Sequence, residues 1–427
     1  MKRSISVAVA LLISLNSILH VQASMAGEAI PVDTAAPAAP SNVLDVNSIA
    51  RFAVIMDYDT GAVLYSKDGD GQMAPASMAK LMTVAVLFDK LKKGELKLND
   101  KFTVSEKAWK LSVVGKNESS KMFVSIGSQI PVEDLLRGII IQSGNDACTV
   151  VAEHLSGDEA QFAEQMNAEA KRIGLKDSVF KNANGLPDPG MHVTAHDLAK
   201  LAAYLIREYP DYYHIFSEKE YTWNGIKQGN RNLLLGRYAG ADGLKTGHTE
   251  SSGYGMVASA KVDGRRLVVV INGLKSDSER AAEAIRLLDI GFKEIKPYAL
   301  FAKDQVIENA DVWAGDAESV PLTVAQDVKF LMRRAQRDTL KVALTYDTPI
   351  MSPIKKGQVV GKLRISGVGL SDLEVPVSAG ADVEEGGFIT QMKLGVKGIF
   401  SGSPEPSAVS REVEPLDGKT ENAPPHE

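Results

Sequence analysis

The order of strand-like and helix-like segments restricts the fold of this chain more than any other feature. Two apolar runs, at 52–56 and 62–65, flank the turn residues Asp59-Thr60-Gly61 and predict a β-hairpin. Helical periodicity then covers 77–93, 132–142, 145–155, 158–173 and 195–208. Strand patterns return at 242–248, 252–262 and 265–273, and a closing helix is predicted over 279–292. An early hairpin and late strands that share one sheet, with helices between them, predict an α+β domain over 48–297.

The segment after residue 297 has a different pattern. Apolar residues alternate on one face of short strands, and proline and glycine break these strands. An example is the series Leu340, Val342, Leu344 and Tyr346. We therefore expect a small all-β domain over 298–385. Residues 403–427 contain five prolines, six acidic residues and no aromatic residue, so we expect a disordered tail.

The N-terminus has the pattern of an export signal. Two basic residues precede an apolar stretch from Ile5 to Leu19, and Val21-Gln22-Ala23 is typical of a cleavage site. We expect a signal peptide over 1–23, a flexible leader over 24–47, and a periplasmic protein. An uncleaved anchor helix is the alternative, but polar residues interrupt the apolar run.

Cysteine content and charge exclude several classes of protein. The 427 residues include one cysteine, Cys148, so no intramolecular disulfide and no cysteine-based zinc site can form. We expect Cys148 to be a small buried side chain rather than a reactive thiol. With 48 basic and 54 acidic residues the formal charge is -6, and we expect no nucleic-acid partner.

The strongest chemical candidate is the sequence Ser77-Met78-Ala79-Lys80. Three residues along a helix place Ser and Lys on one face, where an amine can take the hydroxyl proton. The spacing recurs in an irregular stretch at 178–181, and at 352–355, where Pro353 disfavours a helix interior. Only Ser77 opens a predicted helix, where its alternative role is an N-cap hydroxyl.

Two further motifs follow in order, Ser143-Gly144-Asn145 between predicted helices and Lys245-Thr246-Gly247 on a predicted strand. With the first motif they resemble the signature of the serine penicillin-recognising enzymes, S-x-x-K, S-D-N or S-G-N, and K-T-G. Over 48–385 the chain looks like the low-molecular-mass D-alanyl-D-alanine carboxypeptidases. The resemblance implies an α+β, β-lactamase-like transpeptidase domain with a mostly antiparallel sheet and a helical lobe, followed by a small all-β domain.

The resemblance also implies a nucleophile and a base. Ser77 would attack the penultimate D-alanine of a peptidoglycan pentapeptide stem, release the terminal D-alanine and form an acyl-enzyme for water to hydrolyse. β-Lactam antibiotics would acylate the same serine. Lys80 would be the general base, for which burial and the nearby charge of Lys245 must lower its pKa.

The remaining implied roles concern proton transfer and positioning. Ser143 would relay a proton to the leaving amine, and Asn145 would hold Lys80 and the substrate amide. The alternative for both residues is capping of the next helix. Lys245 and Thr246 would receive the terminal carboxylate of the substrate.

Three further positions complete the implied site. Gly247 would let the substrate backbone approach the strand edge. The backbone N–H groups of Ser77 and His248 would form the oxyanion hole. Arg280 aligns with a family arginine that contacts the terminal carboxylate, and the alternative is a surface arginine on the closing helix.

We expect no cofactor and no metal. His192 and His196 are four residues apart, but Thr194 is a predicted N-cap, which places His192 outside the helix, and no third ligand is apparent. A class A β-lactamase would use the same serine and lysine, but its E-x-x-L-N element is missing. The nearest string begins at Glu164, within a helical pattern.

The motifs also leave an endopeptidase and a scaffold protein open. An endopeptidase that cuts peptide cross-links would use the same acyl-enzyme chemistry, and the sequence hardly separates it from a carboxypeptidase. A non-catalytic protein that only binds peptidoglycan would have no need of both Ser77 and Lys80. The sequence therefore favours an enzyme over a scaffold.

Residues 386–402 predict a segment that associates with a membrane. Its apolar residues recur at helical spacing beside two lysines, and many of these carboxypeptidases carry a C-terminal amphipathic anchor. Gly395 and Gly398 weaken the helix, so we expect only marginal peripheral contact with the inner membrane. A short helix packed on the β domain is the alternative.

Overall fold

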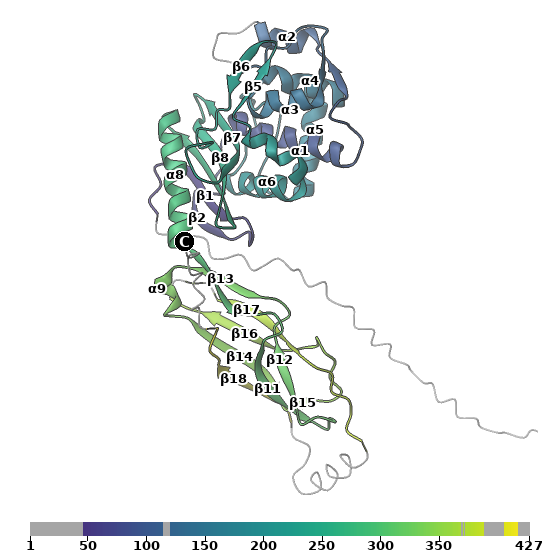
Figure 1. The fold of residues 1–427 in the computed structure, drawn as a ribbon, viewed down its shortest axis with the longest axis vertical. Helices are drawn as coiled ribbons and strands as arrows, with labels where there is room; N and C mark the ends of the chain where they lie inside the picture. The colour runs from purple at the N-terminus through teal and green to yellow at the C-terminus, as the bar shows by residue number, and fades with distance from the viewer. Residues whose placement is uncertain (1–45, 114–119, 369, 371, 388–404, 417–427) are drawn as a thin grey trace, which may run out of the picture. The chain divides into compact units, whose positions relative to one another are not determined.

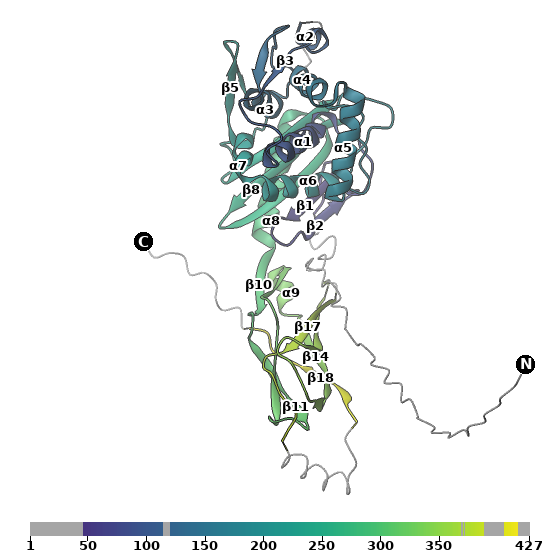
Figure 2. The same cartoon turned by 90° about the vertical axis from the view of Figure 1, so that its right-hand side faces the viewer.

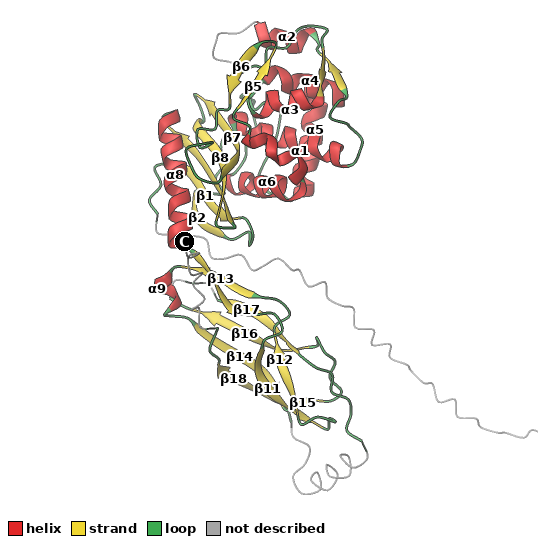
Figure 3. Ribbon diagram, in the orientation of Figure 1, coloured by secondary structure: helices red, strands yellow, loops and turns green. Residues whose placement is uncertain are grey.

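The computed structural model of the chain describes residues 46–113, 120–368, 370, 372–387 and 405–416. Two groups of elements follow each other along the chain. Both helices and strands lie between Phe52 and Glu294, and mainly strands lie between Lys296 and Glu412 (Figures 1 and 3). The predicted site residues all belong to the first group.

A five-stranded antiparallel sheet lies at the centre of the first group. Its order is β2 (Val63–Lys67), β1 (Phe52–Asp57), β9 (Arg265–Leu274), β8 (Gly253–Val262) and β7 (Ala241–Thr249). Val54 and Met56 contact one apolar cluster, whereas Ala53 and Ile55 contact another. Successive side chains of a strand point to opposite faces, so a strand covered on both faces needs an unbroken apolar run. The early hairpin and the late strands share one sheet, as their order predicts.

Helices cover the two faces of this sheet. Helix α8 (Asp277–Glu294) packs Ala284, Leu287 and Leu288 into the same cluster as Ile55. Helix α6 (Ala195–Glu208) contacts β1 and β9 from the helical lobe. Figure 1 shows α8 and the lobe on opposite sides of the sheet.

The central helix of the lobe is α1 (Lys80–Lys92). It is buried without a break from Lys80 to Phe88, and it contacts α6, α3 (Val132–Ile140) and α5 (Glu159–Ile173) (Figure 2). A helix that is apolar on all sides is stable only inside a protein. A polar residue on α1 is therefore held in surroundings that water does not reach.

The predicted helices and strands of this region are present, with boundaries within a few residues. The helix after Ser143 is α4 (Asn145–Ser156), and Thr194 caps α6 by accepting a hydrogen bond from the N–H of Asp197. Several short elements were not predicted: β3 (Lys101–Thr103), α2 (Glu106–Val113), β4 (Gln129–Pro131), α7 (Pro210–Tyr213), η2 (His214–Ser217), β5 (Glu220–Trp223) and β6 (Ile226–Gly229).

The second group has its own sheet and its own core, as expected for an all-β domain. Seven strands follow the order β15-β11-β12-β17-β16-β14-β18. These are β11 (Val306–Trp313), β12 (Ser319–Thr323), β14 (Lys341–Thr348), β15 (Ile350–Met351), β16 (Val359–Ser366), β17 (Leu373–Ala379) and β18 (Ser407–Glu412). A separate pair joins β10 (Lys296–Phe301) to β13 (Val328–Met332), and α9 (Arg334–Arg337) follows. Val342, Leu344 and Tyr346 are buried in one cluster, as their alternation predicts.

The expectation of a disordered tail over 403–427 is wrong for residues 407–412. These residues form β18, which pairs antiparallel with β14 from Ser407 opposite Thr348 to Glu412 opposite Ala343. Composition indicated disorder because most of the side chains are polar and exposed. The backbone hydrogen bonds to an open strand edge and the packing of Val409 on the apolar cluster stabilise the strand instead.

Several expectations fall on residues outside the described ranges. They are the signal peptide over 1–23, nearly all of the leader over 24–47 and nearly all of the amphipathic segment over 386–402. Among the described residues, no helix has the length and apolar character needed to cross a membrane.

Candidate active site

Ser77 lies on η1 (Ala76–Ala79), the 3₁₀ turn that leads into α1. Ala76 before it has a φ of 46°, a backbone conformation that is strained for a residue with a side chain. No side-chain capping bond is found at this turn, so the alternative of an N-cap hydroxyl is wrong. The hydroxyl instead meets an amine, because Ser77 Oγ lies 2.8 Å from Lys80 Nζ.

Lys80 is fully buried and has three oxygen neighbours. Besides Ser77 Oγ, its Nζ donates to Asn145 Oδ1 at 2.8 Å and to the carbonyl oxygen of Asn184 at 2.5 Å. Burial lowers the pKa of Lys80 to about 8, and the guanidinium of Arg231 acts in the same direction. Near neutral pH a minor fraction of this amine is therefore neutral, far more than for a lysine with the usual pKa, as a general base requires.

Lys245 is the second buried amine, on β7. Its Nζ donates to Ser143 Oγ at 2.9 Å and to the carbonyl oxygen of Thr246 at 3.0 Å. Burial and then the charge of Lys80 lower the pKa of Lys245 well below its usual value. The predicted lowering of the Lys80 pKa has burial as its main cause, as expected, but the positive charge that adds to it is that of Arg231 rather than that of Lys245.

Ser143 and Asn145 connect the two lysines. Ser143 is 1% exposed with a φ of 60°, so a second non-glycine residue of the site has a strained backbone. Asn145 is the first residue of α4, and the cap residue Gly144 makes no side-chain capping bond. The side chains of Ser143 and Asn145 thus contact lysines instead of capping the helix.

Gly247 is required by the packing of the protein itself. A Cβ there would lie 3.0 Å from the carbonyl oxygen of Pro75, 3.2 Å from Ala76 Cβ and 3.2 Å from Met78 Cγ. The predicted reason was the approach of a substrate backbone. The structure adds that the missing side chain lets the turn that carries Ser77 lie against β7.

Thr246 and His248 lie on either side of Gly247. Thr246 is 5% exposed, and the exposed imidazole of His248 stacks on the ring of Tyr254 with a centroid distance of 3.9 Å. β7 is the last strand of the five-stranded order, so its outer edge has no strand partner among the described residues.

The alternative of a surface arginine at position 280 is wrong, because Arg280 is only 4% exposed. Its Nη1 donates to the carbonyl oxygens of Gly247 and Gly255, each at 3.3 Å, and its Nη2 pairs with Asp277. Burial lowers the pKa of Arg280. The guanidinium is thus held next to the Lys245-Thr246-Gly247 segment.

Sequence analysis missed several residues that shape the site. Arg231, in the loop before β7, donates to Ser120 Oγ at 2.6 Å and adds a further positive group near the lysines, besides Arg280. Asp146 accepts hydrogen bonds from the backbone N–H groups of Met122, Phe123 and Val124. Neither residue stands in a motif, so only the three-dimensional structure indicates their places.

The loop at 182–187 was also missed as part of the site. The Asn184 carbonyl binds Lys80, while Thr83 Oγ1, one turn further along α1, donates to the carbonyl oxygen of Ala183 at 2.6 Å. Two successive carbonyl groups of one loop are therefore bound by α1. Backbone atoms leave no side-chain signature, so the sequence could not indicate them.

The remaining candidates lie elsewhere. Ser178 Oγ donates to Asp197, Ser352 belongs to the second region, and Glu164 is inside α5. His192 lies outside α6, as predicted from Thr194, and His196 pairs with Asp70 at 2.7 Å. Cys148 is fully buried, and burial raises the pKa of its thiol to about 12, which confirms the prediction of a small buried side chain.

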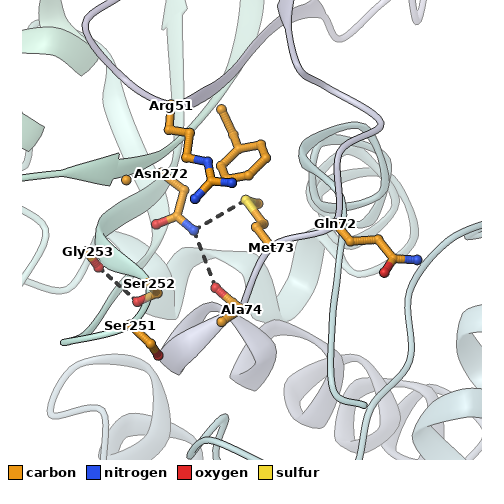
Figure 4. Close-up of a pocket in the computed structure, with 10 residues that line it drawn as sticks. Arg51, Gln72, Met73, Ala74, Ser251, Ser252, Gly253 and Asn272 are labelled. Atoms are coloured by element: carbon orange, nitrogen blue, oxygen red, sulfur yellow. Dashed lines mark hydrogen bonds between the residues drawn. The ribbon is translucent and has the colours of Figure 1, made fainter. Parts of the chain in front are cut away.

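Two cavities lie near the turn that carries Ser77. One, of about 340 Å³, is lined by residues 74–76, 185–189 and 249 among others, and so adjoins the residue before Ser77 and part of the 182–187 loop. The other, of about 280 Å³, includes none of the predicted site residues (Figure 4). There Asn272 donates to Met73 Sδ and to the Ala74 carbonyl oxygen, which ties the segment before Ser77 to β9.

Sequence and structure comparisons give a consistent result. A family profile described as D-alanyl-D-alanine carboxypeptidase, Peptidase S11, matches residues 36–276, and one described as the C-terminal domain of penicillin-binding protein 5 matches residues 296–385. The chain is 39% identical over 341 residues to D-alanyl-D-alanine carboxypeptidase DacC of Escherichia coli K12, which covers 79% of this chain and 85% of that protein.

Two solved structures are similar to this one. Penicillin-binding protein 5 from Haemophilus influenzae has a TM-score of 0.69 at 36% identity, over 80% of this chain and 99% of that one. Penicillin-binding protein D2 from Listeria monocytogenes, in its ampicillin-bound form, has a TM-score of 0.52 at 27% identity, over 58% of this chain and all of that one.

Proposed function

The chain belongs to the D-alanyl-D-alanine carboxypeptidase family of serine peptidases, and on that premise we propose that it removes the terminal D-alanine from peptidoglycan stem peptides through an acyl-enzyme on Ser77. One observation carries the assignment of the nucleophile: the fully buried amine of Lys80 lies 2.8 Å from Ser77 Oγ. A buried amine with a lowered pKa next to a hydroxyl is the arrangement that activates a serine.

The neighbours of Lys80 support its role as the general base. A neutral amine has two N–H groups and one lone pair. Asn145 Oδ1 and the Asn184 carbonyl oxygen can only accept hydrogen bonds, so they take the two N–H groups. The lone pair is then directed at the Ser77 hydroxyl, which donates its proton as Oγ attacks the carbonyl carbon.

Ser143 supplies the proton for the leaving amine, and Lys245 supplies the positive charge that binds the terminal carboxylate. Ser143 Oγ accepts a hydrogen bond from Lys245 Nζ, which leaves its own proton free to pass to the departing amine of D-alanine. Lys245, with Thr246 and Arg280, receives the terminal carboxylate. The approaching negative charge favours the charged form of Lys245.

The N–H groups of Ser77 and His248 stabilise the oxyanion of the tetrahedral intermediate. The proton that Lys80 took from Ser77 then replaces the one that Ser143 gave to the leaving amine, so Lys80 is neutral again. Water hydrolyses the acyl-enzyme as Lys80 takes one of its protons and returns that proton to Ser77 Oγ. A β-lactam follows the first half of this path and stays on Ser77 as an ester. Binding of ampicillin by the similar protein from Listeria monocytogenes is consistent with this inhibition.

We also propose that residues 1–23 direct export and that the enzyme works in the periplasm. Residues 48–297 would then carry the chemistry, and 298–385 would form the separate β domain. Residues 386–402 would make weak peripheral contact with the inner membrane, which binding of the mature chain to anionic vesicles would test. Loss of this binding on deletion of 387–427, with peptidase activity retained, is the expected result.

The decisive experiment maps the adduct of the purified mature protein with a labelled penicillin. An ester on Ser77, together with release of D-alanine from an N-acetylated tripeptide that ends in D-Ala-D-Ala, is expected. A cross-linked dimeric muropeptide distinguishes the endopeptidase from the carboxypeptidase. Faster cleavage of the dimer than of the linear peptide would favour the endopeptidase.

A further inference from the structure

Asp277 forms an ion pair with Arg280, the arginine that we propose binds the terminal carboxylate of the substrate. It is the first residue of α8, and its Oδ1 accepts a hydrogen bond from Nη2 of Arg280, one turn later in the same helix. The same guanidinium donates to the carbonyl oxygen of Gly247 and lies over the ring of Tyr254, at 5.6 Å from the centroid. Arg280 thus contacts both the Lys245-Thr246-Gly247 segment and the carboxylate of Asp277.

The two partners differ in their contact with solvent. The side chain of Asp277 is 47% exposed, whereas that of Arg280 is 5% exposed. The guanidinium is held by backbone carbonyls and by the ring below it, but the carboxylate has no other hydrogen-bond donor among the described residues. Asp277 can therefore turn away into solvent while Arg280 stays in place.

Positive groups of the site lie near Asp277. Lys80, Lys245 and Arg231 act on one another electrostatically, and Arg280 acts on Lys245. Asp277 is an acidic neighbour that Arg231 and Arg280 share, and it favours the charged form of both. Its charge offsets part of the positive field that would attract an anionic substrate.

We propose that Asp277 competes with the terminal carboxylate of the substrate for Arg280, and so sets how strongly the enzyme prefers a free carboxylate at the end of its peptide. This inference rests on the proposed function. Asp277 is about half exposed, so solvent screens its attraction to Arg280 and a bound peptide can displace it. The cost of displacement falls only on ligands whose carboxylate uses Arg280.

Asp277→Asn tests this competition, because it removes the charge and keeps the shape. For the N-acetylated peptide ending in D-Ala-D-Ala, we expect KM to fall by about threefold and kcat/KM to rise by the same factor. A matched peptide with an amidated C-terminus should gain nothing, so the preference for the free acid widens about threefold. A rise in KM for the free acid would mean that Asp277 positions Arg280, and an unchanged preference would mean that it does not compete; either result overturns the proposal.

Two further variants separate this effect from other causes. Asp289→Asn removes the same charge from the same helix, where Asp289 pairs with Lys293 at 3.3 Å, and should leave KM unchanged. In an Arg280→Gln background, Asp277→Asn should no longer lower KM; a persisting decrease would show a general field effect and overturn the proposal.

Other results would contradict the proposed function itself. Absence of D-alanine release by the unaltered protein, or an unchanged KM for Arg280→Gln alone, would contradict the function or the role of Arg280. Asp277 also lies at a helix N-terminus, where a negative charge is favourable, so thermal unfolding of each variant is measured alongside. A lowered KM cannot arise from a loss of stability.

Discussion

The same Ser-x-x-Lys spacing occurs in both regions of the molecule, with opposite surroundings. In the first region Lys80 is fully buried, has three oxygen neighbours and has its pKa lowered to about 8. In the second, Lys355 is exposed, pairs with Glu384 at 2.5 Å, and has its pKa raised by that carboxylate. An exposed, ion-paired lysine keeps its proton, so burial and not spacing makes an amine a base.

The two regions also differ in what they bury. The sheet and lobe of the first region enclose charged side chains such as Lys80, Asp146, Lys245 and Arg280, whereas the buried polar residues described beyond residue 296 are only Thr323 and Ser378. Burying a charge costs free energy unless partners compensate it. The concentration of such groups in one region therefore indicates where the chemistry takes place.

The largest expected effect comes from replacing the serine of each Ser-x-x-Lys sequence, Ser77 in the first region and Ser352 in the second. Ser77→Ala should abolish covalent labelling by penicillin and lower D-alanine release by about 10⁴-fold or more, because the nucleophile is lost. Ser352→Ala should leave both unchanged. Intact-mass spectrometry after incubation with penicillin measures the adduct, and undiminished labelling of Ser77→Ala would break the comparison.

The next effect concerns the two buried lysines. Lys80→Arg keeps the charge but cannot lose its proton, so acylation by penicillin and by peptide should fall by about 10² to 10⁴-fold. Lys245→Arg can still meet a carboxylate, so a larger residual rate is expected. Acylation rates of the two variants are measured by stopped flow. Equal losses would contradict the assignment of Lys80 as the base and Lys245 as the carboxylate-binding residue.

A smaller effect is expected at Gly247. A methyl group there would press on the carbonyl oxygen of Pro75 and on Ala76, and so displace the turn that carries Ser77. Gly247→Ala should lower the acylation rate by about 10 to 100-fold through this misplacement. Gly387→Ala in the second region meets no atom within 4 Å and should change nothing. A wild-type acylation rate for Gly247→Ala would contradict this account of the packing.

The pH dependence of acylation follows from the lowered pKa of Lys80. The base must be neutral, so kcat/KM should fall about tenfold per pH unit well below pH 8 and level off above it. Rates measured from pH 5 to 9.5, with folding monitored by circular dichroism, test the sign. A rate that rises toward low pH would exclude an unprotonated lysine as the base.

The smallest effect is expected at the exposed lysine. Lys355→Met removes a surface ion pair that solvent screens, so thermal stability should hardly change and penicillin labelling should not change. A substantial loss of labelling in this variant would mean that the second region contributes to the reaction.

Local periodicity was enough to predict most of the fold. The strands β1, β8 and β9 and the helices α1 and α6 carry long apolar patterns, and the structure places them where these patterns predict. The hairpin of β5 and β6 is mostly exposed and polar, so it has no apolar alternation to detect. The composition of β18 predicts disorder, but the strand is stabilised by pairing with the open edge of β14, more than 50 residues earlier in the chain. Composition contains no information about such a distant partner.

The site was predictable where side chains stand in motifs, and not where backbone or loop residues act. Ser77, Lys80, Ser143, Asn145 and Lys245 come together as their motifs indicate. The Asn184 carbonyl and Arg231 had no such signal. The sequence aligned Arg280 with a family position but did not show that Asp277 pairs with it, because the pairing depends on the rotamers of two side chains at a helix end.

The bond between Lys80 and the Asn184 carbonyl ties the base to a loop as well as to a helix. If the segment 182–187 moved away from α1, one N–H group of Lys80 would lose its acceptor. The lone pair of the amine would then no longer be directed at the Ser77 hydroxyl. If this loop opens, the rate of acylation depends on the fraction of time for which it is closed, and changes that increase hydrogen exchange of the amides at 183–186 should slow acylation. Changes that loosen this loop should slow acylation even where Ser77 and Lys80 themselves are unaltered.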